Sequence, residues 1–350
     1  MRIVKAARIH YYGGWEAVKI EEISLPKLRV AELLVRVHAA GVNPVDWKIR
    51  AGQLRQMMPL SLPFTLGCDF SGVVEELRPG VGNFKVGDEV YGQAPVFTGA
   101  SGSFAEAVII RTTGSIAPKP RNVDHTQAGA LPLAGVSALQ AITEHLRVSA
   151  GQTILIHGGA GGIGSMAIQL AKHLGARVVT TASADNMEYV RGLGADTVID
   201  YQKEDFAEAR GVDAVFDTVG GETYARSYRV LKKGGRIVSM LEKPRRDLMT
   251  EFGVEAMAQR TQVTTDRLNT LAQLVDQGVL EVHVAETFSP EQAAAAISRM
   301  EKGSLRGKVV LRIPAPDPAS PALLPHQPQS PTCGDISGRP QGIGAKRLAG

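Results

Sequence analysis

The sequence predicts an α/β protein with a β-rich domain and a second domain built on a doubly wound parallel sheet. Residues 1–122 contain short strand-like runs separated by turn signals such as Pro79-Gly80 and Gly87-Asp88, a pattern typical of a small barrel or sandwich. After residue 123 strand-like and helical segments alternate, which favours parallel strands joined by crossover helices. The length of 350 residues also suits two globular units better than one.

The clearest alternating unit lies near the middle of the chain. Residues 153–157 (TILIH) form an apolar strand-like run, residues 163–174 carry apolar side chains at helical spacing, and residues 177–181 (RVVTT) form the next strand-like run. Residues 314–350 are rich in Pro, Gly, Ser and Gln without periodicity, so we expect a disordered tail there.

Composition excludes several classes of function. The net charge of +4 is small for 350 residues and gives no reason to expect a nucleic-acid or membrane partner. No apolar run approaches the length of a spanning helix, so we expect a cytoplasmic protein. The 2 cysteines, Cys68 and Cys333, are far apart and belong to no metal-binding pattern, so we expect no metal site.

A glycine-rich turn follows the strand-like run 153–157. It contains G-x-G-x-x-G at Gly159, Gly161 and Gly164 and opens a helix. We assign Gly159 to the tight turn, Gly161 to close approach of a pyrophosphate, and Gly164 to close packing of the helix. The helix start would then offer free N–H groups to the phosphates. The sequence therefore predicts a dinucleotide site whose cradle comprises Gly159, Ala160, Gly161, Gly162, Ile163 and Gly164.

The stretch after the second strand favours NADP(H) over NAD(H). An NAD site usually carries an acid at this point to bind the ribose hydroxyls, but no acid appears before Asp185. We expect Ser183 and Asn186 to bind the 2′-phosphate and Tyr201 to cover it. Asp185 argues mildly against this interpretation, and an obvious Arg or Lys clamp is missing from the local sequence.

The chain resembles the zinc-free quinone oxidoreductases and enone reductases of the medium-chain dehydrogenase/reductase superfamily. The resemblance spans residues 3–313 and rests on motifs that occur in order: AGVNPVDWK (40–48), LGCDFSG (66–72), FKVGDEVYG (84–92), the glycine-rich turn, LGAD (193–196) with IDY (199–201), DTVGG (217–221), KGG (233–235) and RGKVV (306–310).

The resemblance implies a GroES-like catalytic domain that is split in sequence around a Rossmann domain. We therefore expect residues 1–122 to form the GroES-like domain, 123–265 the Rossmann NADP-binding domain, 266–313 a return segment that completes the catalytic domain, and 314–350 the tail. It further implies an active site in the cleft between the domains and a homodimer.

The zinc-dependent relatives are similar to this chain but carry metal ligands that it lacks. They place Cys where this chain has Asn43, His where it has Cys68, and an acid where it has Asp69; the third ligand would fall near residues 131–135, which contain neither Cys nor His. A catalytic zinc site takes three protein ligands. Without a Lewis acid, we expect substrates already activated by conjugation, namely quinones and α,β-unsaturated carbonyls.

The motif at residues 40–48 supplies the candidate catalytic residues. The family often has Tyr where this chain has Lys48, and we expect Lys48 to donate a hydrogen bond or proton to the substrate oxygen. Asn43 is expected to bond the nicotinamide ribose or the substrate, and Asp46 to orient Lys48. A solvated surface lysine and a loop-capping acid are the alternatives for Lys48 and Asp46.

Two other functions remain open at this stage. One is an NADPH-binding redox sensor or interaction protein with little turnover, which the coenzyme motif alone does not exclude. The other is a zinc-free dehydrogenase that acts on an acyl thioester or a synthase-bound chain. A cluster of basic residues around the cleft would favour it, and Arg245-Arg246 is a short basic pair in the relevant half.

Overall fold

Three β-sheets organise residues 2–314, the part of the chain that the computed structural model describes. A 3-stranded sheet has the order β2-β1-β4, and a 7-stranded sheet has the order β15-β16-β3-β5-β6-β8 with β7 paired to β3. Their strands are β1 (Ile3–Ile9), β2 (Val18–Ser24), β3 (Glu32–Val42), β4 (Phe64–Thr65), β5 (Asp69–Leu77), β6 (Glu89–Gln93), β7 (Ala107–Arg111), β8 (Ser115–Pro118), β15 (Val284–Phe288) and β16 (Lys308–Arg312).

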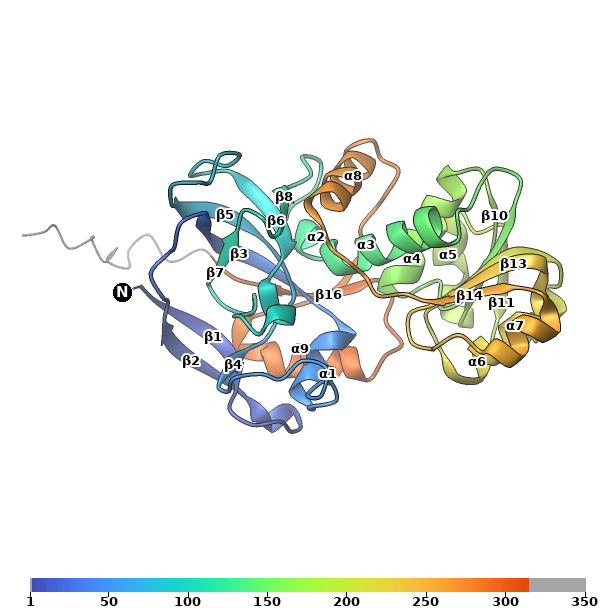
Figure 1. The fold of residues 1–350 in the computed structure, drawn as a ribbon, viewed down its shortest axis with the longest axis horizontal. Helices are drawn as coiled ribbons and strands as arrows, with labels where there is room; N and C mark the ends of the chain where they lie inside the picture. The colour runs from blue at the N-terminus through green and yellow to red at the C-terminus, as the bar shows by residue number, and fades with distance from the viewer. Residues whose placement is uncertain (1, 315–350) are drawn as a thin grey trace, which may run out of the picture. The chain divides into compact units, whose positions relative to one another are not determined.

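The C-terminal strands complete the N-terminal β-rich domain. Strand β16 runs antiparallel to β3, with Val309 opposite Val42. In Figure 1 the orange β16 and α9 (Ala293–Glu301) lie beside the blue N-terminal elements. Strands β15 and β16, which follow the α/β segment in sequence, therefore belong to the same sheet as β3.

The α/β domain contains a 6-stranded parallel sheet of order β11-β10-β9-β12-β13-β14. Ile154 and Ile156 enter one hydrophobic core, whereas Leu155 between them enters another. Because successive side chains of a strand point to opposite faces, both faces of the sheet are covered, as a doubly wound sheet requires. Its strands are β9 (Thr153–Ile156), β10 (Arg177–Ala182), β11 (Thr197–Asp200), β12 (Val212–Asp217), β13 (Leu231–Ser239) and β14 (Glu255–Ala258).

In the central unit the helices agree with the predicted pattern. Elsewhere the structure contains helices and strands that were not predicted. The helix expected over residues 163–174 is α4, and the segment after Asp124 is divided into α2, α3 and a π-helical turn (Gln140–His145). Helices α1, α6 and α7 and strands β14 and β15 were not predicted. The helices are α1 (Pro44–Arg50), α2 (His125–Gly129), α3 (Pro132–Leu139), α4 (Gly162–His173), α5 (Met187–Gly192), α6 (Gly221–Ser227), α7 (Arg246–Phe252), α8 (Thr265–Asp276) and α9.

Two further points concern membrane-spanning helices and the C-terminal residues. Within residues 2–314, no helix combines the length and the apolar character needed to cross a bilayer. The expected disordered tail lies, beyond Pro314, outside the described residues.

Candidate functional site

The glycine-rich turn joins the end of β9 to the start of α4. Gly158 adopts φ +71°, so the sharp turn falls one residue before the position that we assigned to it. Gly159 serves another purpose: a Cβ there would collide with the Thr180 side chain on β10. A Cβ on Gly164 would collide with the Gly158 carbonyl, so this glycine lets α4 begin directly against the turn.

Gly161 differs from its neighbours because it faces open space. A Cβ built on Gly161 would meet only the Gly158 carbonyl oxygen, at 3.4 Å. The residue lies just before α4, with φ −72° and ψ 171°. The first N–H groups of a helix lack acceptors within it, so the start of α4 presents free donors beside this open face. The turn therefore fits a phosphate group, as the motif predicts.

Arg306, which is far from this region in sequence, contacts the loop after β10. Arg306 donates from Nε to Asn186 Oδ1 (3.0 Å) and from Nη2 to the Asp185 carbonyl (2.8 Å). Its guanidinium carbon lies 5.2 Å from the centroid of the Tyr189 ring. Asn186 in turn donates to Ser183 Oγ (2.9 Å). Two of the predicted coenzyme residues thus share a network with a cation from the return segment.

The other predicted coenzyme residue, Tyr201, follows β11. Its side chain is 56% exposed, and its backbone N–H donates to the Ala182 carbonyl at 3.3 Å. This bond places the Tyr201 backbone beside the end of β10, immediately before Ser183. Tyr201 is therefore near the loop that it is expected to cover.

Asn43 and Asp46 form the start of α1. The backbone N–H of Asn43 donates to Asp46 Oδ2 (2.7 Å), and Pro44 occupies the first helical position. Both residues are buried: the exposed fraction is 2% for Asn43 and 0% for Asp46. An Asn cap, a Pro at the first position and an acid three residues after the cap form a helix-start signal that the sequence analysis missed.

Lys48 lies on α1, two residues after Asp46. Its Nζ is 5.6 Å from the centroid of the Trp47 ring, and the residue is partly exposed. Asp46 is instead directed toward the Asn43 backbone, with the Cys68 thiol beside it. The geometry gives Asp46 a helix-capping role and does not show it orienting Lys48.

Asn43 connects a second carboxylate to a buried lysine. Its Nδ2 donates to Asp69 Oδ2 (2.9 Å), and its Oδ1 accepts from Lys308 Nζ (2.5 Å). Asp69 also accepts from the Leu133 N–H in the first turn of α3, at 3.1 and 3.2 Å. Because these bonds use both ends of the Asn43 amide, its side chain is held as part of a buried network.

Burial dominates the electrostatics of this network. It raises the pKa of Asp46 to about 7 and that of Asp69 to about 6, and it lowers the pKa of Lys308. Burial also raises the pKa of the Cys68 thiol, which is fully buried, so this cysteine packs as a small apolar residue.

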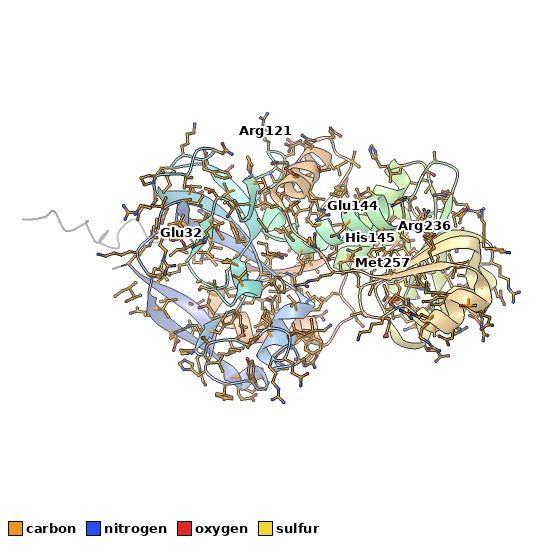
Figure 2. The ribbon with its side chains drawn as sticks, in the orientation of Figure 1. Glu32, Arg121, Glu144, His145, Arg236 and Met257 are labelled. Atoms are coloured by element: carbon orange, nitrogen blue, oxygen red, sulfur yellow. The ribbon has the colours of Figure 1, made fainter. Side chains whose placement is uncertain are left out.

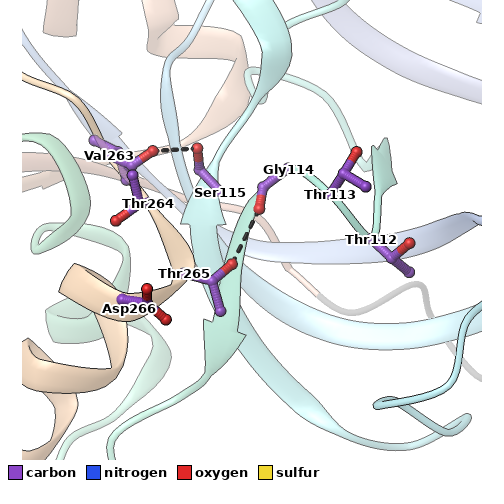
Figure 3. A pocket seen from close by; sticks show the side chains of 8 residues that line it. All are labelled: Thr112, Thr113, Gly114, Ser115, Val263, Thr264, Thr265 and Asp266. Atoms are coloured by element: carbon purple, nitrogen blue, oxygen red, sulfur yellow. Dashed lines mark hydrogen bonds between the residues drawn. The ribbon is translucent and has the colours of Figure 1, made fainter.

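Two further observations concern metals and pockets. Among residues 2–314, the structure brings together no group of three or more His, Cys, Asp or Glu side chains suited to a metal ion. None of the predicted site residues lines the pocket of about 250 Å³ that Figure 3 shows. There Ser115 Oγ donates to the Val263 carbonyl (2.5 Å) and Thr265 Oγ1 to the Gly114 carbonyl (3.1 Å). These bonds connect the segment after β14 to β8, so the pocket lies where these two segments pack together. Its lining residues are Thr112, Thr113, Gly114, Ser115, Val263, Thr264, Thr265 and Asp266.

A glycine turn at the end of a parallel strand, a helix start facing open space, and a split β-rich domain define a two-domain dinucleotide-binding protein. Comparison with known families agrees. Residues 29–121 match the alcohol dehydrogenase GroES-like domain, and residues 193–311 match a family described as zinc-binding dehydrogenase.

Individual relatives point the same way. The chain is 36% identical over 312 residues to an NADPH-dependent alkenal/one oxidoreductase of Arabidopsis thaliana, covering 86% of this chain and 77% of the relative. A 2-methylene-furan-3-one reductase of Solanum lycopersicum is 34% identical over 86% of this chain and 76% of its own length.

Solved structures give a matching fold. The quinone oxidoreductase of Coxiella burnetii superposes with a TM-score of 0.83 at 35% identity, covering 89% of this chain and 100% of the other. The Escherichia coli quinone oxidoreductase complexed with NADPH gives a TM-score of 0.80 at 27% identity, covering 88% and 99%. The chain belongs to the medium-chain dehydrogenase/reductase superfamily, and it is an oxidoreductase.

Proposed function

We propose that this protein is a zinc-independent reductase that uses NADPH to reduce a quinone or an α,β-unsaturated carbonyl compound. The observation that carries the proposal is the open face at Gly161 together with the Arg306 network on the loop after β10. The names of the relatives, an alkenal/one oxidoreductase and quinone oxidoreductases, support the substrate class.

The coenzyme is NADP(H), and Arg306 supplies the cation that distinguishes it from NAD(H). A guanidinium binds a phosphate through charge-assisted hydrogen bonds, which are stronger than bonds between neutral groups. Arg306 already contacts Asn186, and Asn186 contacts Ser183. A 2′-phosphate at this loop would therefore meet one positive charge and two neutral side chains, and Arg306 compensates for the repulsion expected from Asp185.

The reduced nicotinamide supplies a hydride when it is bound. The protein then has to stabilise the negative charge that develops on the substrate oxygen. Lys48 is the proposed donor to that oxygen, because its ammonium lies at a partly exposed position on α1. Asn43 and Asp46 fix the start of the same helix through the bond between the Asn43 N–H and Asp46 Oδ2. Their role is to hold α1, and thus Lys48, in place.

Catalysis without zinc is consistent with the charges near Asn43. The Lys308 ammonium is hydrogen-bonded to Asn43 Oδ1, in the same cluster as Asp69 and Cys68. A divalent cation placed among these residues would be repelled by the ammonium, and the carboxylates already have a counter-ion. These residues favour a site that works without metal, although one matching family is described as zinc-binding.

The proposal is tested by following NADPH oxidation with 1,4-benzoquinone, 9,10-phenanthrenequinone, acrolein, longer 2-alkenals and simple enones. NADH and a chelator-treated sample serve as parallel assays. Turnover that prefers NADPH and survives chelation is expected. Loss of activity on chelation would contradict zinc independence. Tight NADPH binding without turnover of any acceptor would favour the redox sensor instead.

We also propose that the protein forms a homodimer through β14. This strand is the last of the 6-stranded order, and its Met257, marked in Figure 2, is 44% exposed. An exposed strand edge with an apolar side chain is a template for pairing with a second chain. Sedimentation of the wild type and of Met257→Lys tests this, since the substitution is expected to shift the protein toward the monomer. An unchanged dimer would place the interface elsewhere.

A further inference from the structure

Three consecutive residues of the return segment touch three different parts of the candidate site. Arg306 donates to Asn186 and to the Asp185 carbonyl on the loop after β10. The Gly307 N–H donates to the Ala160 carbonyl of the glycine turn at 2.8 Å, and Gly307 forms a parallel bridge with Gly161. Lys308, the next residue, crosses to the catalytic segment.

The Lys308 side chain extends from the glycine turn to the start of α1. A Cβ placed on Gly162 would lie only 2.6 Å from Lys308 Cδ, so the lysine stem passes directly over the first residue of α4. Beyond that point Nζ donates to the Val42 carbonyl (3.0 Å) and to Asn43 Oδ1 (2.5 Å). The residue is only 3% exposed. One side chain thus contacts both the coenzyme turn and the residue that caps α1.

The network around the Lys308 ammonium leaves it little freedom to move independently. Asn43 also donates to Asp69, and Asp69 accepts from the first turn of α3. Removing one partner from a buried network leaves another polar group unsatisfied, which is costly in a medium of low dielectric. Lys308 therefore connects the turn at Gly162 to Asn43 through packing at one end and a hydrogen bond at the other.

We propose that Lys308 is a positioning residue that links occupancy of the glycine turn to the order of residues 42–50, the segment that carries Lys48. Filling the turn fixes Gly162, the lysine stem packed on it holds the ammonium, and the ammonium holds the cap of α1. The link itself requires only that a dinucleotide binds at the turn. Its catalytic consequence, order at Lys48, rests on the proposed function.

Hydrogen–deuterium exchange with and without NADPH tests the link without any turnover. In the wild type, NADPH is expected to slow exchange in peptides covering residues 158–170 and also in those covering 42–50. In Lys308→Met, protection of 158–170 is expected to persist while that of 42–50 is lost. A variant that protects both regions as the wild type does, or a wild type that protects only 158–170, would overturn the proposal.

Two further variants separate the link from simple loss of a buried lysine. Lys119 has a side chain that is 5% exposed, and its Nζ donates to the carbonyls of Pro120 and Val123. Lys119→Met is therefore the matched control, and it should keep NADPH-dependent protection of residues 42–50. If Lys308→Met does not fold, Asn43→Ala removes the acceptor of the ammonium instead. It should lose the same protection, and retained protection would again overturn the proposal.

Kinetics give a second readout in the same proteins. Lys308→Met is expected to lower kcat by about tenfold or more while the NADPH dissociation constant changes by less than about threefold, since the coenzyme turn itself is intact. Equal losses in affinity and kcat would indicate a general structural defect and contradict the link. If the wild type binds NADPH but reduces no acceptor, the proposed function fails, whereas the exchange experiment still decides the link.

Discussion

The Arg306 guanidinium donates a hydrogen bond of 3.0 Å to Asn186 Oδ1, across 120 positions of sequence. This contact brings a cation from the return segment to the loop that the sequence assigns to the 2′-phosphate. In the proposed function, Arg306 supplies the positive charge for NADPH that the sequence near the end of β10 lacks. The contact also makes Arg306 the most direct target for mutagenesis.

Arg306→Gln is expected to raise the NADPH dissociation constant by about 10- to 100-fold, because hydrogen bonds to a charged group contribute roughly 1.5–3 kcal/mol. NADH, which lacks the 2′-phosphate, should bind with nearly unchanged affinity. Titration calorimetry with both coenzymes measures the difference. Arg312→Gln, a change at an exposed position of β16, is the control and should leave both affinities as they are. Equal losses for NADPH and NADH would remove Arg306 from coenzyme selection.

Gly161→Val should abolish NADPH binding while the protein remains folded. The new side chain would meet only the Gly158 carbonyl oxygen, at 3.4 Å from its Cβ, but it would occupy the open face of the turn. Gly164→Val is the contrasting variant, since its Cβ would collide with that same carbonyl and should lower the thermal midpoint by several degrees. Circular dichroism and NADPH titration distinguish the two effects. Unchanged affinity in Gly161→Val would exclude the turn as the phosphate site.

Lys48→Met should lower kcat by about 10²-fold, the cost of losing a donor to a developing oxyanion, with little change in NADPH affinity. Lys48→Arg keeps a positive donor and should retain much of the rate. Lys19→Met, an exposed substitution on β2, controls for loss of a surface charge. Wild-type kinetics in Lys48→Met would instead identify a solvated lysine, the alternative that the sequence left open.

His157 should make the protein sensitive to acid. Burial lowers the pKa of this imidazole to about 4, with Ser227 Oγ 2.9 Å from Nε2. The unfolded chain, with an ordinary pKa near 6.5, binds the proton first as the pH falls. The stabilising contribution is therefore complete above about pH 6.5 and is lost progressively toward pH 4.

The test compares the free energy of unfolding of the wild type and His157→Gln between pH 7.5 and pH 4. The wild type should lose up to ~3 kcal/mol more than the variant over this window. Asp46 and Asp69, whose pKa values are raised, titrate in both proteins and cancel in the difference. Parallel pH profiles would show that His157 titrates normally.

The sequence predicted most of the elements whose signals are local. The run β9, glycine turn, α4 and β10 was recovered within a few residues because an apolar strand, a glycine pattern and a helical period follow one another directly. The exact turn residue was misplaced, since the motif alone does not reveal that Gly158 takes the positive φ. Strand β14 was missed because its sequence, EAMA, has no alternation, and it is defined by pairing with β13. The domain boundaries at residues 122, 265 and 313 stay a prediction.

The site was harder to predict than the fold. Asn43, Asp46 and Lys48 were identified through a motif, but the bond from the Asn43 side chain to Asp69 depends on how β5 approaches the start of α1. Arg306 and Lys308 were quoted only as part of a family motif. Their partners lie 120 and 265 positions away, which no local pattern encodes. A lysine is also usually expected at the surface, so the buried position of Lys308 had no sequence signal.

The decisive measurement is a crystal structure of the protein soaked with NADPH. We expect density for the pyrophosphate on the backbone at Gly161–Gly164 and for the 2′-phosphate beside Arg306. A dinucleotide bound elsewhere, or a glycine turn that stays empty at saturating NADPH, would contradict it.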